Sequence, residues 1–262
     1  MDIIQTFYDK MATQYDKLFQ DWYATTKEQA LILDRIFKSN GYRILDCACG
    51  FKSNGYRILD CACGIGTQAI GLAALGYDVT ASDISNAELT EAKRRADEYN
   101  VKISFENADF RELSDVFDSQ FDIVIAMDNA LPHMLTASDL QKAVGSICGR
   151  VAKGGMFVAS IRDYDSLLES KPPYSPPYIH KTENGQRVSF QTWNWNGDSY
   201  RLVQYIVEDE DTLELSKFEC EYRAVRRAEL SSMLAVAGFG KAEWKFPDET
   251  GFYQPIVIAH KS

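Results

Sequence analysis

A glycine loop between an expected strand and an expected helix constrains the fold of this chain most. The loop runs Gly64-Ile65-Gly66-Thr67-Gln68-Ala69 and follows the apolar stretch Ile58-Leu59-Asp60. Glycines let a backbone approach a ligand closely, and a helix that begins at Thr67 presents free N–H groups to it. A strand, a G-x-G-x-x-A loop and a helix in this order therefore indicate an α/β protein with a nucleotide-like cofactor.

The segment that leads into this loop occurs twice in tandem. Residues 37–50 and 51–64 both have the sequence FKSNGYRILDCACG, and only the second copy continues into Ile65-Gly66-Thr67. We expect the second copy to fill the strand position, because the first copy would lose the loop. The first copy then becomes an added connection, which costs little entropy but leaves an apolar strand sequence unpaired. An erroneous repeat in the sequence is the alternative, and an intact mass of the purified protein distinguishes the two.

Expected strands and helices alternate through the first 161 residues. This alternation predicts an α/β fold: a Rossmann-like, doubly wound, mostly parallel sheet with helices on both faces. We expect Ser85 to cap one helix, with Glu88 as its capping-box partner. The expected helices span residues 3–19, 22–37, 67–75, 86–98 and 138–151, the last ended by Lys153-Gly154-Gly155. The expected strands span 78–82, 102–106, 121–127 and 156–161.

The pattern changes after residue 162. Prolines interrupt residues 172–177, and three stretches of alternating apolar and polar residues follow, at 187–195, 200–208 and 212–223. We interpret 172–223 as a small antiparallel β insertion. A helix over 226–237 and strands near 241–246 and 253–260 complete the chain, with an antiparallel final strand. We therefore expect a single domain over 1–262 with an N-terminal helical lid over 1–36.

Composition and charge narrow the class of partner. The formal net charge is −10, which disfavours a nucleic acid or an anionic membrane as partner. No apolar stretch is long enough to span a bilayer, so we expect a cytoplasmic protein. The six cysteines include two Cys-Ala-Cys pairs that arise from the repeat, and their spacing is not the usual C-x2-C of a zinc site. We expect reduced thiols and no metal.

Two acidic residues select among nucleotide-like cofactors. Asp60 ends the strand before the loop, and Asp83 ends the next strand, where a carboxylate can accept ribose hydroxyls. A carboxylate at the loop would repel the pyrophosphate of a dinucleotide. S-adenosylmethionine carries an ammonium, a sulfonium and a carboxylate but no phosphate. The acids therefore favour S-adenosylmethionine.

The motifs ILDCACGIGT, VTASDIS, NADF and FDIVIAMDNALPHM, with AGF before two final strands, resemble the class I S-adenosylmethionine-dependent methyltransferases over nearly the whole chain. Ala62 departs from the pattern, since many members have glycine there. Asp109 has an alternative interpretation as a helix N-cap. The resemblance implies that Asp60, Gly64 and Gly66 line the methionine part and that Asp83 holds the ribose. It also implies that Ile84, Asp109 and Phe110 meet the adenine; we add Ala62, Thr67 and Met127 to the expected cofactor site.

The segments 127–133 and 160–165 resemble those of glycine/sarcosine N-methyltransferases. The resemblance implies that Asn129 meets the amine of a small acceptor and that Arg162 clamps its carboxylate. An arginine fork suits that task because it binds carboxylates bidentately. His133 can take the amine proton if its pKa lies near the working range. The aromatic N-terminal segment resembles a lid, with Tyr8, Tyr15 and Trp22 as candidates and Tyr15 as the one assigned to catalysis.

Several alternatives stay open at this point. Arg162 can instead pair with Asp163 or Asp165 at the surface, and Asn129 can be a turn residue. His133 and the lid aromatics can be packing residues. The acceptor can be another small metabolite methylated on oxygen or nitrogen, rather than an amino acid. Two other protein classes are a dinucleotide oxidoreductase and a cofactor-binding protein impaired by the repeat.

Overall fold

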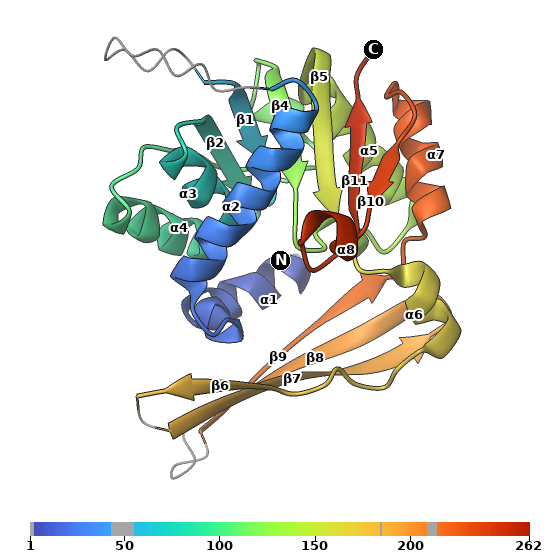
Figure 1. Ribbon diagram of the computed structural model, residues 1–262. Helices are drawn as coiled ribbons and strands as arrows, with labels where there is room; N and C mark the ends of the chain where they lie inside the picture. Colours follow the sequence, from blue (N-terminus) through green and yellow to red (C-terminus); the bar gives the residue numbers. More distant parts are fainter. Residues whose placement is uncertain (1–2, 43–54, 184, 209–213) are drawn as a thin grey trace.

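The computed structural model describes residues 3–42, 55–183, 185–208 and 214–262. Its centre is a seven-stranded sheet in the order β10-β11-β5-β4-β1-β2-β3, and β6 to β9 form a second, four-stranded sheet (Figure 1). The strands are β1 Arg57–Asp60, β2 Asp78–Asp83, β3 Ser104–Asn107, β4 Phe121–Ala126, β5 Val151–Ser160, β6 Tyr178–Thr182, β7 Gly185–Asn196, β8 Ser199–Glu208, β9 Glu214–Arg223, β10 Glu243–Lys245 and β11 Ile256–His260. The α-helices are α1 Ile3–Met11, α2 Trp22–Ser39, α3 Thr67–Ala74, α4 Asn86–Glu98, α5 Ala137–Arg150, α6 Tyr164–Ser170, α7 Arg227–Ala237 and α8 Pro247–Thr250. Short 3-10 helices cover Ala12–Leu18, Leu113–Asp115 and Leu131–His133.

The α/β fold class is confirmed. Strands β1 to β5 pair in parallel, and β11 runs antiparallel to both β5 and β10. Side chains alternate between the two faces of the sheet as the strand period requires. Ile58, Ile123 and Ile125 pack on the face covered by α2, α3 and α4. Leu59 and Val124 pack on the other face, with α5 and α7. The doubly wound arrangement follows from strands that are apolar on both faces.

Strand β1 comes from the second copy of the repeat. Residues 57–60 pair with β2 on one side and with β4 on the other, so this copy occupies the middle of the sheet. Ile58, Leu59 and Asp60 are fully buried there. The glycine loop therefore stays directly connected to its strand. The expectation for the first copy concerns residues 43–50, which lie outside the described part of the chain.

The second sheet lies below the first in Figure 1, and α1 packs between them, against β9 and α4. Four strands form it rather than three, because β6 pairs with β7 at its edge. The N-terminal helix expected over 3–19 divides into α1 and a 3-10 segment. Side chains of this segment reach the second sheet: Lys17 pairs with Glu208 at 2.6 Å, and Gln14 accepts a hydrogen bond from Ser216. The N-terminal segment thus connects the two layers.

The expected start of strand β5 is wrong. The helix ends at Arg150, and β5 already begins at Val151, five residues before the expected strand. Gly154-Gly155, interpreted as a helix stop, instead lies in β5, where the pairing with β4 is irregular. A Cβ on Gly155 would lie 2.8 Å from the carbonyl oxygen of Asp122 on β4, so the close approach of these backbones requires glycine.

The described residues also bear on the expectations about membrane-spanning segments and about the state of the cysteines. No helix in this part of the chain is both long and apolar enough to cross a membrane. Cys61, Cys63, Cys148 and Cys220 are buried free thiols, whereas Cys47 and Cys49 fall outside the described residues.

The repeat provides a matched test of the sheet register. Replacing Leu59 by alanine removes a fully buried side chain from β1, and we expect the free energy of unfolding to fall by about 2–5 kcal/mol. Leu45→Ala is the same change in the first copy and serves as control. We expect it to cost less than half as much in urea denaturation. Equal losses would contradict the second-copy register.

Candidate active site

The main pocket lies where the strand order reverses, at the carboxyl ends of β1, β2 and β4. Open α/β sheets bind their ligands at this position. The pocket has an empty volume of about 740 Å³ and is lined by the glycine loop, the β2–α4 junction, the turns after β3 and β4, and the N-terminal segment. Lining residues that the sequence analysis named are Tyr8, Tyr15, Ala62, Gly64, Thr67, Asp83, Ile84, Asp109, Phe110, Met127 and His133.

The glycine loop has a backbone that only glycine adopts easily. Gly64 and Gly66 have φ values of 51° and 91°. Gly66 is the N-cap of α3, and a Cβ there would lie 2.8 Å from the Cδ1 atom of Ile70. Ala62 is not among the described residues with positive φ, which explains why a Cβ is tolerated where related sequences have glycine. The N–H of Gly64 donates to the Asp83 carboxylate at 2.9 Å and so fixes the loop against β2.

Buried carboxyl groups surround this loop. Burial, with a smaller contribution from the nearby Asp83 and Asp128, raises the pKa of Asp60 to about 8 against the opposing hydrogen bond from the Ala62 N–H. Burial likewise raises the pKa of Asp83 and Asp128, although Gly64 and Ser85 N–H groups stabilise the Asp83 carboxylate. The Oδ2 atom of Asp60 has no hydrogen-bond partner among the described residues. The pocket therefore favours a ligand with positive charge and hydrogen-bond donors.

Glu88 departs from its expected role. Ser85 caps α4 as predicted, since its Oγ atom accepts from the Glu88 N–H at 3.1 Å. The capping box is nevertheless incomplete, because Asp83 accepts the hydrogen bond from the Ser85 N–H. The Glu88 side chain is fully buried and lines the pocket instead. Competition from the Asp83 carboxylate for the Ser85 N–H frees Glu88 for the pocket wall.

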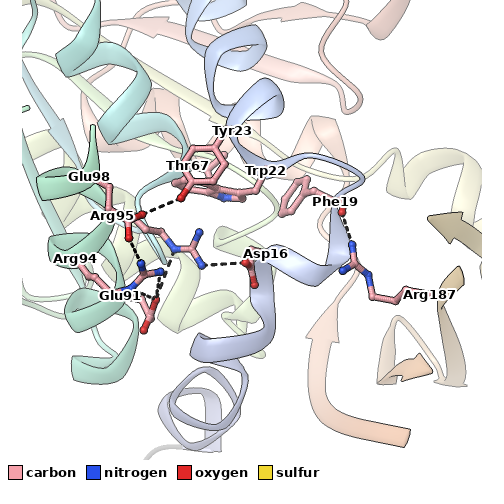
Figure 2. Close-up of polar contacts among 10 residues, drawn as sticks. All are labelled: Asp16, Phe19, Trp22, Tyr23, Thr67, Glu91, Arg94, Arg95, Glu98 and Arg187. Atoms are coloured by element: carbon pink, nitrogen blue, oxygen red, sulfur yellow. Dashed lines mark hydrogen bonds and ion pairs between the residues drawn. The ribbon is translucent and has the colours of Figure 1, made fainter. Parts of the chain in front are cut away.

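The N-terminal segment closes over the pocket through a set of contacts centred on Trp22. The indole N–H of Trp22 donates to Thr67 Oγ1, at the start of α3, at 3.0 Å. Arg95 of α4 lies 4.5 Å from the Trp22 ring and pairs with Asp16 at 3.2 Å (Figure 2). On the other side of the segment, Arg187 of β7 donates to the backbone oxygen of Phe19 at 2.7 Å. The segment that bears Tyr15 is thereby held by both α4 and the second sheet.

Asn129 and Arg162 meet beside the pocket. Asn129 Oδ1 accepts from the Arg162 N–H at 3.0 Å, and its Nδ2 donates to the Tyr164 hydroxyl at 2.9 Å. Asn129 is buried and does not line the pocket, and its φ of 71° is unusual for a residue other than glycine. In this arrangement Asn129 positions Arg162; its direct contact with an acceptor amine stays a prediction.

The guanidinium of Arg162 is surrounded by neutral groups. It donates to the Tyr200 hydroxyl at 2.6 Å and to Gln191 Oε1 at 3.0 Å, and it lies 5.1 Å from the ring of Trp193. The described residues include no carboxylate in ion-pair distance of Arg162; Asp163 and Asp165 pair with Arg227 instead. The surface ion pair considered for Arg162 is therefore wrong, and a partly buried cation remains available for an anionic group.

His133 has a different protonation state from the one expected. Burial, with a smaller contribution from the charge of Arg162, lowers its pKa to about 3 against an opposing backbone hydrogen bond with Glu221. The imidazole is neutral at neutral pH and is a weak base, so the expectation of a pKa near the working range is wrong. Its Nε2 atom lies 2.7 Å from the Tyr8 hydroxyl. His133 thus connects the turn after β4 to the lid.

Asp109 does not cap a helix. The 3-10 helix that follows begins at Leu113 with Glu112 at its N-cap. Asp109 accepts instead from the backbone N–H and the guanidinium of Arg111, both at 2.8 Å. Its contact with adenine stays a prediction.

Some predicted residues do not line the pocket, and some residues that line it were not predicted. Asp60 and Gly66, like Trp22, Asn129 and Arg162, are not among the residues that line the pocket. Lining residues that were not expected in the site are Ile4, Cys61, Cys63, Ile65, Gln68, Glu88, Ala108, Arg111, Asp128, Ala130 and Met134. Of these, Asp128 accepts hydrogen bonds from Gln68 and from Tyr253. Its position directly after β4 is the one signal that could have identified it.

The pocket fits S-adenosylmethionine on its own chemistry. The carboxyl groups of Asp83, Glu88 and Asp128 line the pocket; they suit a ligand with cationic groups and hydroxyl donors, and they oppose a pyrophosphate. The glycine loop and the N-terminus of α3 leave backbone N–H groups for a carboxylate. Asp83 and the loop line the pocket and would hold the cofactor, whereas a contact of Asp60 with the ligand stays a prediction.

Comparisons with known proteins agree with this fit. Residues 58–155 match a family model described as a methyltransferase domain. This match, together with the fold and the site, supports a class I S-adenosylmethionine-dependent methyltransferase. The fold of this chain superposes on the solved structure of the CcbJ methyltransferase from Streptomyces caelestis with a TM-score of 0.74. The two sequences are 18% identical, and the superposition covers 100% of this chain and 99% of that one.

Curated relatives include two small-molecule N-methyltransferases. The glycine/sarcosine N-methyltransferase of Parasynechococcus marenigrum (strain WH8102) is 28% identical over 166 residues, which is 63% of this chain and 54% of that protein. The glycine N-methyltransferase of Homo sapiens is 28% identical over 252 residues, covering 88% of this chain and 80% of that protein. The chain thus spans about half the length of the first of these relatives.

The buried acid Asp60 predicts a pH dependence of stability. Its pKa is raised from an ordinary 3.8 to about 8, so between these values the folded protein holds a proton that the unfolded chain releases. The free energy of unfolding then falls as the pH rises through this range, by at most about 1.4 kcal/mol per pH unit from this group. We expect Asp60→Asn to flatten the fall measured by urea denaturation between pH 5 and 8, whereas the exposed Asp97→Asn leaves it unchanged. A wild-type slope in D60N would contradict the assignment.

The Trp22 contact predicts a cost for loosening the lid. Trp22→Phe keeps an aromatic ring near Arg95 but removes the hydrogen bond to Thr67, and we expect a loss of about 1 kcal/mol in the free energy of unfolding. Tyr23→Phe is the control, because it removes an exposed hydroxyl contact with Glu98. Chemical denaturation measures both. Equal losses in the free energy of unfolding for the two variants would show that burial of the Trp22 hydrogen bond does not increase its contribution to stability.

Proposed function

We propose that this protein transfers a methyl group from S-adenosylmethionine to the amine of a small amino acid, such as glycine or sarcosine. The observation that carries the proposal is the partly buried Arg162, which lies beside the cofactor pocket with neutral partners only. Such a cation suits the carboxylate of an acceptor. The names of the two N-methyltransferase relatives support the same acceptor class.

Methyl transfer requires orientation more than proton chemistry. The nucleophile must approach the methyl carbon in line with the breaking bond, in a site that excludes water. Arg162 can fix one end of the acceptor by a bidentate contact with its carboxylate. Tyr200 and Gln191 hold that guanidinium in place through hydrogen bonds, and Asn129 holds the Arg162 backbone N–H. When bound, S-adenosylmethionine supplies the activated methyl group.

The proton of the acceptor amine needs no strong base in this proposal. His133 is neutral and weakly basic, and amines enter from solution partly in the neutral form. We therefore infer that the protein selects the neutral amine, and that His133 and Tyr8 keep the lid closed during transfer. Activity should then rise with pH as the free amine fraction rises.

The test of the acceptor class is a substrate panel with matched arginine variants. We expect labelled methyl transfer to glycine, sarcosine or dimethylglycine, and less to amines of similar size without a carboxylate. Arg162→Ala should raise KM for the accepted amino acid by about 10- to 100-fold, because a hydrogen bond to a charged group contributes about 1.5–3 kcal/mol. Arg201→Ala removes a half-exposed arginine of β8 and is the control.

Binding of S-adenosylhomocysteine should be unchanged in Arg162→Ala, which separates loss of the acceptor site from unfolding. An unchanged KM and kcat in this variant would overturn the role of Arg162. Equal transfer to amines without a carboxylate would overturn the amino acid class of acceptor and leave the methyltransferase assignment intact.

A further inference from the structure

Glu88 is a buried carboxyl group without a role in the fold. Its side chain is fully buried, and neither of its oxygens has a hydrogen-bond partner among the described residues. Such a group destabilises the folded protein unless it gains a hydrogen-bond partner, because a buried polar atom without a partner retains its full desolvation penalty. Burial raises its pKa well above the ordinary value, as do Asp83 and Asp9, and Arg95 opposes them. The two oxygens face a pocket, so a ligand can provide the missing donors.

The position of Glu88 indicates which part of a ligand it meets. A Cβ on Gly64 would lie 2.6 Å from Glu88 Oε2, and the N–H of the same Gly64 donates to Asp83 Oδ2. The two carboxyl groups therefore lie on either side of one glycine of the loop. A carboxylate at the end of the second strand of such a sheet accepts ribose hydroxyls. Glu88 is thus placed at the ribose end of the pocket.

The two other acids that could accept a ribose hydroxyl, Asp83 and Asp60, are less suited to this role than Glu88. Both oxygens of Asp83 accept backbone hydrogen bonds, from Gly64 and from Ser85 at 2.9 Å each. Asp60, the other carboxyl with an unpartnered oxygen, ends β1 and is influenced by Asp128. The two unpartnered carboxyls are therefore separated, one on β1 and one on α4.

We propose that Glu88 is a second ribose-binding residue, which accepts a hydrogen bond from a cofactor hydroxyl beside Asp83. Asp83 then mainly fixes the glycine loop, and Glu88 supplies the free acceptor. This inference rests on the S-adenosylmethionine site and is independent of the acceptor proposed above. It also implies that Glu88 lowers the stability of the cofactor-free protein and raises its affinity for the cofactor.

The experiment measures cofactor affinity and stability in the same variants. Glu88→Met replaces the carboxyl by an apolar side chain of similar length. Isothermal titration gives the Kd of S-adenosylhomocysteine and of its 2′-deoxy and 3′-deoxy forms, without any methyl acceptor. We expect Glu88→Met to weaken S-adenosylhomocysteine by about tenfold or more, which is the effect of one hydrogen bond to a charged group. For the form that lacks the contacted hydroxyl, the same substitution should change the Kd by less than about threefold.

Thermal unfolding without ligand provides the second readout. We expect Tm to rise in Glu88→Met, because the unsatisfied group is removed, and to stay constant in the control Asp97→Asn, an exposed acid on the same helix. Glu88→Gln keeps one acceptor and should give a smaller loss of affinity, and it replaces the methionine variant if that one fails to fold.

Two outcomes would overturn the proposal. An unchanged Kd for S-adenosylhomocysteine in both Glu88 variants would mean that the group contacts no part of the ligand. An equal loss for all three ligands would mean that Glu88 acts elsewhere, for example through the lid residues Tyr8 and Tyr15, which line the same pocket. Neither outcome depends on which amine is methylated, so failure here is distinguishable from failure of the proposed acceptor.

Discussion

The hydrogen bond from the Gly64 N–H to the Asp83 carboxylate is the interaction on which the site depends. It joins the loop after β1 to the end of β2 at 2.9 Å, and it requires the left-handed backbone at Gly64. Because Asp83 also accepts from the Ser85 N–H, the start of α4 is fixed by the same carboxylate. The pocket, the cap of α4 and the release of Glu88 from the capping box all follow from this one acceptor.

Electrostatics connect this loop to the choice of ligand. The carboxyls at the pocket have raised pKa values because burial disfavours their charged forms. A cationic ligand reverses that preference, whereas a pyrophosphate would increase it. Arg162 lies beside the pocket and presents positive charge among Tyr200 and Gln191. The site thus separates a negative cofactor region from a positive region, an arrangement suited to a cationic cofactor and an anionic acceptor.

Much of the fold could be predicted because it depends on local patterns. The strand and helix limits near β2, α4 and α7 agree with the structure, since apolar periodicity and capping residues such as Ser85 act within a few residues. The β5 boundary could not be predicted, because Gly154-Gly155 has the composition of a helix stop. Its bulge is decided by the neighbouring strand β4. The extra strand β6 likewise depends on its partner β7, since the sequence around the prolines has no strong period of its own.

The sequence by itself determined the class of the fold, the glycine loop and the pair of acids Asp60 and Asp83, because each of these is a short segment whose chemistry is local. Only the tertiary structure decided the roles of Asn129, His133 and Glu88. Burial and neighbours from distant segments set them: Asn129 is taken by Arg162 and Tyr164, and His133 loses its basicity on burial. Glu88 becomes unpartnered because Asp83 takes the hydrogen bond that its own capping box would have used. The repeat shows the same division: the sequence identifies the copy that continues into the loop, and the tertiary structure places the strand of that copy between β2 and β4.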